Sequence, residues 1–293
     1  MKKNNLHLSI IPSYKCNLNC DYCYLGKLRY DSTTVDLSIL QERIKEIESE
    51  YNIEYISLYG GEISILDKKY LDNIMKVIKN YNVNITTNLT NDWIIDYCRD
   101  NNLILNISLN EERPNYKQVL KKINDIDCSI TSVVLPSMLK KSAKEILEFY
   151  DSIGKNVFFL EYHPSEYNKK YDITTKDYVI FLKQIITEYN RGNYSFNIEN
   201  INILEDNEYN PTQEGFLFIL PNGKYGSVSY DNNIEKLLEF DTLDEWKNNC
   251  KKEKEEYFNK CYMCEFFGRC KAEHLKTYTP PYCSGLYEII KEM

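Results

Sequence analysis

Short β-branched segments alternate with longer amphipathic segments through roughly the first 160 residues, and this alternation constrains the fold most strongly. The strand-like segments are residues 6–12, 53–59, 83–87, 103–109, 128–135 and 156–162, and the helix-like segments are 37–50, 69–80, 92–101, 115–124 and 143–153. Strands that alternate with helices form a parallel sheet with the helices packed outside it. Six such units predict an α/β fold built on a partial (βα)6 barrel.

The alternation stops near residue 174. A helix is expected over residues 178–190, followed by a polar stretch without strong periodicity. Residues 216–220 and 225–230, joined through Asn222-Gly223, read as a β-hairpin. A helix is expected from Leu237 to about Tyr257. We therefore expect a barrel core over 1–173, a connecting helix and linker over 174–209, and a small domain over 210–293.

Composition narrows the partners and the compartment. The net charge of −8 argues against a nucleic-acid groove. No signal peptide opens the chain and no apolar run reaches the length of a membrane span, so a cytoplasmic protein without a membrane partner is expected. In a reducing compartment, clustering among the ten cysteines indicates metal ligation rather than disulfides.

The tightest cysteine grouping follows the first strand directly. Cys16, Cys20 and Cys23 form a CxxxCxxC motif, and functional residues of parallel α/β sheets gather at the carboxyl ends of strands. Three thiolates can hold three irons of a four-iron four-sulfur cluster and leave the fourth iron open. A structural zinc site is the alternative, although such sites usually use paired CxxC knuckles.

This motif, with the aromatic Tyr22 before its third cysteine, resembles the signature of the radical S-adenosylmethionine (SAM) family. The resemblance implies that Cys16, Cys20 and Cys23 hold a 4Fe-4S cluster and that Tyr22 contacts the cofactor. It also implies that SAM chelates the open iron and that one electron cleaves it. The resulting 5′-deoxyadenosyl radical then abstracts a hydrogen atom from the substrate.

The second strand ends in a glycine turn, Gly60-Gly61-Glu62. Two glycines let a ligand approach the backbone closely, although glycine pairs are also common in ordinary turns. One βα unit after the cysteine motif, this turn resembles the GGE motif of the family. The resemblance implies that Glu62, directly or through the structure around it, binds the amino group of the SAM methionine.

Two further strand ends resemble family contacts. Thr87 and Asn88 close the third strand, and Ser108 and Asn110 close the fourth. The resemblance implies that these side chains hold the ribose hydroxyls and the carboxylate of SAM. Because such residues also cap the helices that follow strands, a purely structural role is the alternative.

Two histidines have different expected positions. His163 follows the sixth strand and should face the same mouth of the barrel, as pocket lining, a surface residue or a proton donor. His7 lies early in the first strand, so it is expected at the opposite end in a structural role.

A second cysteine grouping lies near the end of the chain. Its spacing is a strong metal signal that fits either an iron–sulfur cluster or zinc. With the hairpin and helix before it, the grouping resembles the SPASM extension of radical SAM enzymes or its shorter form, twitch. The resemblance implies one auxiliary 4Fe-4S cluster, because the extra ligands of full SPASM domains are missing. Its ligands would be Cys261, Cys264, Cys270 and Cys283.

Three cysteines remain outside these groupings: Cys98, Cys128 and Cys250. Free cysteines are usually small buried hydrophobes. A thiol could also donate a hydrogen atom to a substrate radical, as in relatives that invert an amino-acid stereocentre. Cys250, on the helix that enters the second cysteine grouping, is the candidate for that role.

The resemblance implies an enzyme that modifies a ribosomally synthesised precursor peptide by forming a thioether, a carbon–carbon crosslink or an epimer. A flavodoxin or ferredoxin is the expected electron donor. A radical SAM dehydrogenase of a small molecule is the first alternative. A non-enzymatic iron–sulfur redox or sensor protein is the second, although an open iron argues against it.

Overall fold

The computed structural model describes residues 3–165, 168, 171–205, 213–231, 234–264, 278–279 and 282–283. Its main element is a nine-stranded sheet with the order β6-β5-β4-β3-β2-β1-β7-β8-β9. The strands are β1 (Asn4–Ile10), β2 (Tyr51–Leu58), β3 (Asn82–Thr87), β4 (Ile104–Ser108), β5 (Ser129–Val133), β6 (Val157–Leu160), β7 (Phe216–Ile219), β8 (Tyr225–Asp231) and β9 (Ile234–Phe240). A separate antiparallel pair joins β10 (Tyr278–Thr279) to β11 (Tyr282–Cys283).

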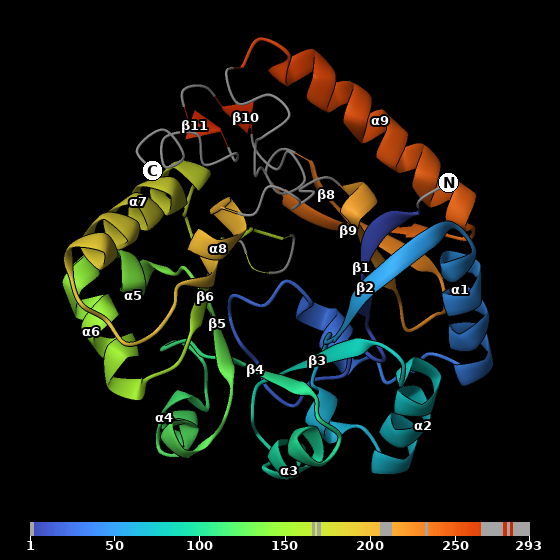
Figure 1. Ribbon diagram of the computed structural model, residues 1–293, viewed down its shortest axis with the longest axis horizontal. Coiled ribbons are helices and arrows are strands. Elements are labelled where there is room, and N and C mark those ends of the chain that lie inside the picture. The colour runs from blue at the N-terminus through green and yellow to red at the C-terminus, as the bar shows by residue number, and fades with distance from the viewer. Residues whose placement is uncertain are drawn as a thin grey trace.

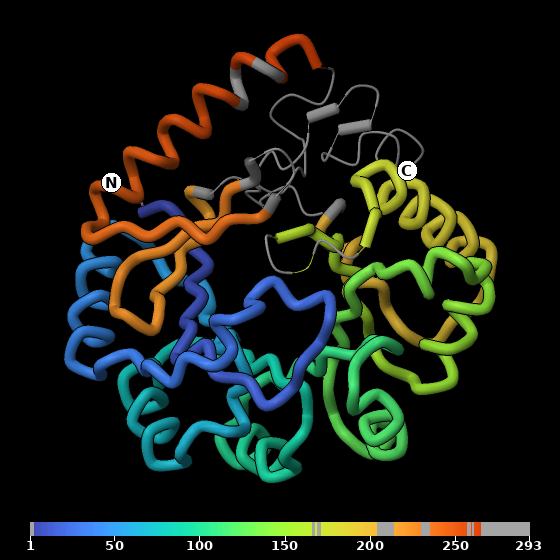
Figure 2. The backbone as a smooth tube through the Cα atoms, turned by 180° about the vertical axis from the view of Figure 1, so that it is seen from behind, coloured from blue at the N-terminus to red at the C-terminus, as the bar shows by residue number. Residues whose placement is uncertain are grey.

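Helices surround the curled sheet on its outer side (Figure 1). Seen from behind, α7 and α9 lie on opposite sides of this ring (Figure 2). The helices are α1 (Leu37–Glu50), α2 (Lys68–Ile78), α3 (Trp93–Asp100), α4 (Tyr116–Leu120), α5 (Pro136–Leu139), α6 (Ala143–Ile153), α7 (Thr175–Arg191), α8 (Glu199–Glu205) and α9 (Leu243–Cys261). None of these helices is both long and apolar enough to cross a bilayer within the described residues.

The first six strands pair in parallel, which confirms the predicted partial barrel. β7 then pairs in parallel with the other edge of β1. The predicted hairpin is also confirmed, since β7 and β8 are antiparallel. The turn between them contains Gly223 at φ 77°, a left-handed conformation that favours glycine. The division of the chain at residues 174 and 210 stays a prediction.

The predicted helix from Leu237 is wrong at its start. Residues 234–240 form β9, which pairs with β8 along its whole length and extends the sheet. α9 begins only at Leu243, where Thr242 and Glu245 form reciprocal side-chain to backbone bonds of 3.2 and 3.4 Å. This Thr-x-x-Glu capping signal is present in the sequence and marks the true helix start.

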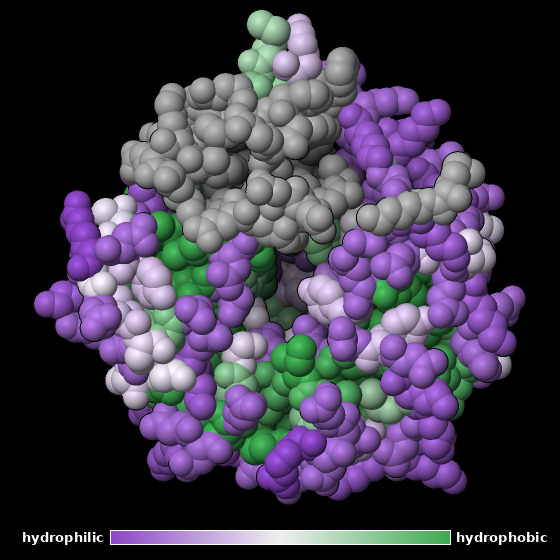
Figure 3. All heavy atoms as spheres, in the orientation of Figure 1, coloured by the Kyte–Doolittle hydropathy of each residue, from purple (hydrophilic) through white to green (hydrophobic). Residues whose placement is uncertain are grey.

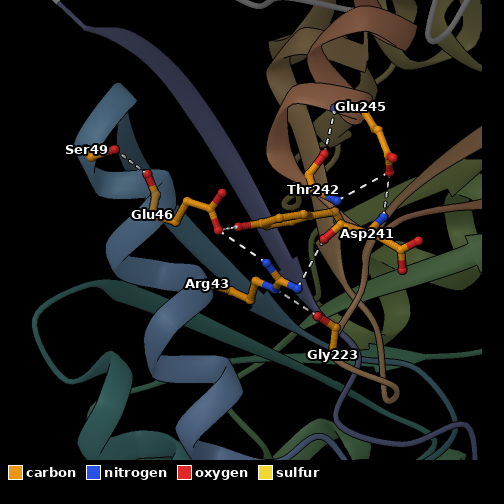
Figure 4. A network of polar contacts seen from close by, with 8 residues as sticks. Arg43, Glu46, Ser49, Gly223, Asp241, Thr242 and Glu245 are labelled. Atoms are coloured by element: carbon orange, nitrogen blue, oxygen red, sulfur yellow. Dashed lines mark hydrogen bonds and ion pairs between the residues drawn. The ribbon is translucent and has the colours of Figure 1, made fainter.

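Polar contacts fasten the β7–β9 region to α1 (Figure 4). Arg43 donates to the Gly223 carbonyl at 3.0 Å and to the Asp241 carbonyl at 3.2 Å. Its guanidinium carbon also lies 4.7 Å from the ring centre of Tyr225, whose hydroxyl donates to Glu46 at 2.6 Å. Because the sequence separation is large, these contacts fix the later strands against the first βα unit.

The two faces of the parallel sheet differ in polarity. Outward residues such as Leu8, Ile10 and Ile56 are completely buried under the helices. The alternate residues of the strands line the inside of the curl and are mainly polar, as period-two alternation requires. They include His7, Ser9, Ser57, Asn84, Thr86, Asn106, Ser108 and Thr131. The space-filling view shows a hollow near the centre of the visible face (Figure 3).

Candidate functional site

The CxxxCxxC motif lies in the loop that follows β1. Cys16, Cys20 and Cys23 line one cavity of about 450 Å³, together with residues at the carboxyl ends of β2 to β6. The Cys16 amide donates to the Arg29 carbonyl at 3.0 Å, and the Cys23 amide donates to the Cys20 carbonyl at 3.1 Å. The loop is therefore held by its own backbone with three thiols on one wall.

Burial disfavours the charged form of the three thiols, and binding of a metal cluster would offset that penalty. Burial raises the pKa of Cys16, Cys20 and Cys23, and the Arg113 guanidinium opposes this rise at Cys20. The Leu18 amide donates to the Cys16 sulfur at 3.4 Å, and the Asn88 side-chain amide lies 3.8 Å from it. Donors at sulfur favour the thiolate, which is the metal-binding form.

The glycine turn packs against the segment that leads to Cys16. Gly60 has φ 141°, and a Cβ on it would lie 2.6 Å from the Ile11 side chain. A Cβ on Gly61 would lie 2.0 Å from the Lys15 carbonyl oxygen. The Gly61 amide donates to the Ser13 carbonyl at 3.1 Å. Both glycines are therefore needed for the two loops to approach each other.

Glu62 connects the ends of β2 and β3. Its side chain is almost fully buried and accepts hydrogen bonds from the Ser64 amide at 2.9 Å, the Asn88 amide at 2.7 Å and the Thr87 hydroxyl. The carboxylate is thus engaged by the protein itself. These hydrogen bonds hold the backbone at the ends of β2 and β3, and the contact of Glu62 with SAM stays a prediction.

Ser108 lines the cavity, whereas Asn110 is not among the lining residues. The Asn110 side-chain amide donates to the Val133 carbonyl at 2.7 Å and accepts from the Val133 amide and the Tyr22 hydroxyl, each at 3.3 Å. Asn110 therefore joins the end of β4 to β5 and orients Tyr22, which itself lines the cavity.

Sequence reasoning missed Arg113. This residue lines the cavity, its guanidinium carbon lies 5.9 Å from the Tyr22 ring centre, and its Nε is buried without a hydrogen-bond partner. It lies in an irregular segment after β4, so no periodicity or spacing marks it. A buried N–H group of this kind can donate a hydrogen bond to an anionic group of a ligand.

His163 reaches the cavity as expected and lies beside Glu161. The His163 Nε2 and Glu161 Oε2 atoms are 3.6 Å apart, and both side chains are buried. The Thr175 hydroxyl at the start of α7 donates to Glu161 at 2.8 Å. The carboxyl end of β6 therefore presents a paired acid and imidazole to the cavity.

The expected position of His7 away from the cavity is wrong, whereas its structural role stays a prediction. Its ring lines the same cavity, with Nε2 2.9 Å from the Ser57 hydroxyl and its centre 3.8 Å from that of Tyr55. His7 shares the inward face of β1 with Ser9, and the cavity extends down this face. The position of His7 early in β1 therefore does not exclude its side chain from the cavity.

The second cysteine grouping is only partly described. Cys261 ends α9, and the Cys264 amide donates to the Cys261 carbonyl at 2.8 Å. Cys270 and the side chain of Cys283 lie outside the described residues. Within the residues that are described, Cys16, Cys20 and Cys23 included, no three His, Cys, Asp or Glu side chains gather around one metal-ion position. The four-cysteine auxiliary site stays a prediction.

The three remaining cysteines lie away from the cavity wall. Cys250 is buried in α9, and burial raises its pKa. Burial also raises the pKa of Cys98 to about 12 and that of Cys128 to about 11. Cys128 lines a separate hollow of about 1010 Å³ at the amino ends of β3 to β5. The position of Cys250 gives its suggested hydrogen-donor role no support.

Comparison with known proteins finds similarity to one family over part of the chain. Residues 10–135 match the family model described as the radical SAM superfamily. The putative peptide biosynthesis protein YydG of Bacillus subtilis is 29% identical over 168 residues. The match covers 51% of this chain and 52% of that protein, so the chain spans about half the length of this curated relative.

Solved structures share the fold at low sequence identity. The structure of anSMEcpe with bound AdoMet and the Cp18Cys peptide matches this chain with a TM-score of 0.70 and 16% identity. The match covers 98% of this chain and 96% of the anSMEcpe chain. SuiB of Streptococcus suis bound to S-adenosylmethionine has a TM-score of 0.66 and 18% identity, with coverage of 93% and 73%. The alternation of strands and helices, the cysteine triad and the family match agree, and residues 10–135 of this chain are similar to the radical SAM superfamily.

Proposed function

We propose that this protein is a radical SAM enzyme that reductively cleaves SAM and modifies a precursor peptide. The observation that carries the proposal is the convergence of Cys16, Cys20 and Cys23 on one cavity at the carboxyl ends of the strands. The glycine turn and Arg113, whose Nε has no partner, line the same cavity as the three cysteines.

The residues present fit both expected cofactors. Three thiols can each bind one iron of a four-iron cluster and leave the fourth iron for SAM. When bound, the cluster and SAM supply an electron and a hydrogen-abstracting radical. Every other requirement, namely binding, orientation and exclusion of water, falls to this chain.

Backbone groups of the glycine turn and the side chain of Arg113 provide complementary binding groups. Since the Glu62 carboxylate already accepts three hydrogen bonds, the backbone carbonyls of the turn are the groups proposed to accept from the methionine ammonium. The buried Arg113 Nε offers a donor for the carboxylate. Thr87, Asn88 and Ser108 line the cavity. The Ser108 hydroxyl is proposed to bind the ribose, whereas the side chains of Thr87 and Asn88 hydrogen-bond to Glu62 and Asn17 and, like Tyr22 and Asn110, shape the wall.

A peptide substrate is supported by two relatives. YydG is described as a putative peptide biosynthesis protein, and SuiB has been solved bound to the precursor peptide SuiA, with a TM-score of 0.57 and 18% identity to this chain. The proposed products are a thioether, a carbon–carbon crosslink or an epimer. We further propose a cytoplasmic enzyme with a flavodoxin or ferredoxin donor and an auxiliary 4Fe-4S cluster in a twitch-like domain over 210–293.

The test is incubation of the reconstituted protein with SAM, dithionite and a short precursor peptide encoded beside its gene. The expected result is peptide-dependent release of 5′-deoxyadenosine with a loss of two hydrogens, or deuterium uptake from D2O, measured by mass spectrometry. An unchanged peptide, with turnover of a small molecule instead, would contradict the peptide assignment and favour a dehydrogenase.

A further inference from the structure

The floor of the cavity, formed by the inward side chains within the strands, contains a polar side chain without a hydrogen-bond partner. Asn84 lies in the middle of β3 and lines the cavity. Its side chain makes no hydrogen bond within the described residues, and its Oδ1 is buried. A buried amide oxygen without a partner destabilises a folded protein, so such a group calls for an explanation.

Two neighbouring polar side chains of the floor, Asn106 and Ser57, are engaged. The Asn106 amide donates to the hydroxyls of Thr131 at 2.8 Å and Thr86 at 3.3 Å and accepts from Ser129 at 3.2 Å. The Ser57 hydroxyl, directly across from Asn84 in the register of β2 and β3, contacts His7 at 2.9 Å. The two asparagines have the same chemistry on adjacent strands, yet only Asn106 has its partners in the protein.

The charges that line the cavity lie elsewhere. Arg113, Glu161 and His163 follow the carboxyl ends of β4 and β6, and Arg29, Glu62 and Glu235 also lie outside β3 to β5. The cavity-lining residues within β3, β4 and β5 are amides, hydroxyls and the apolar Val133, and none of them carries a charge. A charged group placed on this floor would lose water without gaining an opposite charge. A neutral carboxamide can both donate to and accept from the Asn84 amide.

We propose that Asn84 binds a neutral carboxamide of the substrate, either a peptide link or an Asn or Gln side chain. This inference rests on the proposed function and names the chemical group that enters the floor of the same cavity. Asn84 is then a specificity-determining residue whose hydrogen bonds are completed only when substrate is bound.

The first test is thermal unfolding of two matched variants, Asn84→Leu and Asn106→Leu, which have similar side-chain volumes. Asn84→Leu removes an unsatisfied amide, so its Tm should rise by about 2–4 °C, whereas Asn106→Leu leaves hydroxyls unpaired and should lower Tm by at least about as much. A fall in Tm for Asn84→Leu equal to that for Asn106→Leu would assign Asn84 a structural role and overturn the proposal.

The second test measures binding of labelled, capped heptapeptides with three glycines on each side of a central Gln, Leu or Glu. Asn84→Ala should weaken binding about tenfold. Weakening confined to the Gln peptide identifies a side-chain amide, and equal weakening of all three identifies a peptide link. No binding to the wild-type protein, or no weakening in the variant, would overturn the inference.

These readouts do not require SAM turnover. If wild-type protein fails to cleave SAM, the proposed function fails, while the Tm and binding measurements still decide the assignment of Asn84.

Discussion

The two ends of the barrel hold hollows of very different character. The hollow at the amino ends of β3 to β5 is the larger, about 1010 Å³ against about 450 Å³, and it also contains a cysteine, Cys128. Its charged residues, including Asp72, Lys76 and Lys79, are exposed. At the carboxyl end, Glu62 and other polar groups are buried and connected. Size therefore does not identify the site, but convergent buried polar groups do.

The sharpest test of this contrast replaces one cysteine at each end of the barrel with serine. Cys20→Ser removes one thiolate from the triad, so cluster binding and SAM cleavage should be abolished. Cys128→Ser, the matched control at the amino end, should leave both unchanged. Iron per chain and 5′-deoxyadenosine formation are the measurements. Equal iron content in the two variants would contradict the assignment of the triad.

A second prediction concerns the buried carboxylate at the carboxyl end. Glu62→Gln weakens three hydrogen bonds to one charged group and presents an NH2 group to backbone donors. The free energy of unfolding should fall by about 3 kcal/mol in denaturant titrations. Glu111→Gln, which affects only a half-exposed pair with Lys141, should change it by less than about 1 kcal/mol. Similar losses in the two variants would remove the distinction.

A third prediction separates binding from stability. Arg113→Leu should weaken SAM binding to the reconstituted protein about 10–100-fold, because a hydrogen-bonded charge pair is lost. Its unfolding free energy should fall by no more than about 1–2 kcal/mol, since the buried Nε has no partner to lose and the guanidinium loses only its contact with Tyr22. Arg99→Leu, on the exposed surface of α3, is the control for calorimetric titration. Unchanged SAM affinity in Arg113→Leu would exclude the proposed carboxylate contact.

The smallest effect is expected for a contact that belongs to neither hollow, the one between α1 and the β7–β9 region. Arg43→Ala removes two hydrogen bonds to carbonyls and the contact with the Tyr225 ring, and should destabilise the protein by about 1–2 kcal/mol. SAM cleavage per intact cluster should stay the same. A loss of cleavage without a loss of stability would show that the β7–β9 region acts on the site itself.

Sequence alone predicted the barrel because period-two strands and amphipathic helices alternate clearly along the chain. The triad and glycine turn were also visible, since short-range spacing encodes a loop and a close backbone approach. The Leu237-Leu238 pair fits either a helix or a strand, and only pairing with β8 decides between them. Tertiary context overrides such local ambiguity.

The missed parts of the site depend on curvature and on distant contacts. Whether His7 faces a cavity depends on how the sheet curls, which a strand pattern does not specify. Arg113 comes from an irregular segment, and its position follows from the packing of Tyr22 against Asn110. Asn84 and Asn106 cannot be told apart from the sequence, and only the structure of the cavity shows that Asn84 lacks hydrogen-bond partners.

The most direct measurement of the central claim is anaerobic reconstitution with iron and sulfide, followed by dithionite and SAM and detection of 5′-deoxyadenosine. The account predicts 5′-deoxyadenosine from the wild-type protein, with about eight irons per chain if the auxiliary cluster is present and about four if it is not. Protein that binds iron at Cys16, Cys20 and Cys23 but never cleaves SAM would contradict it.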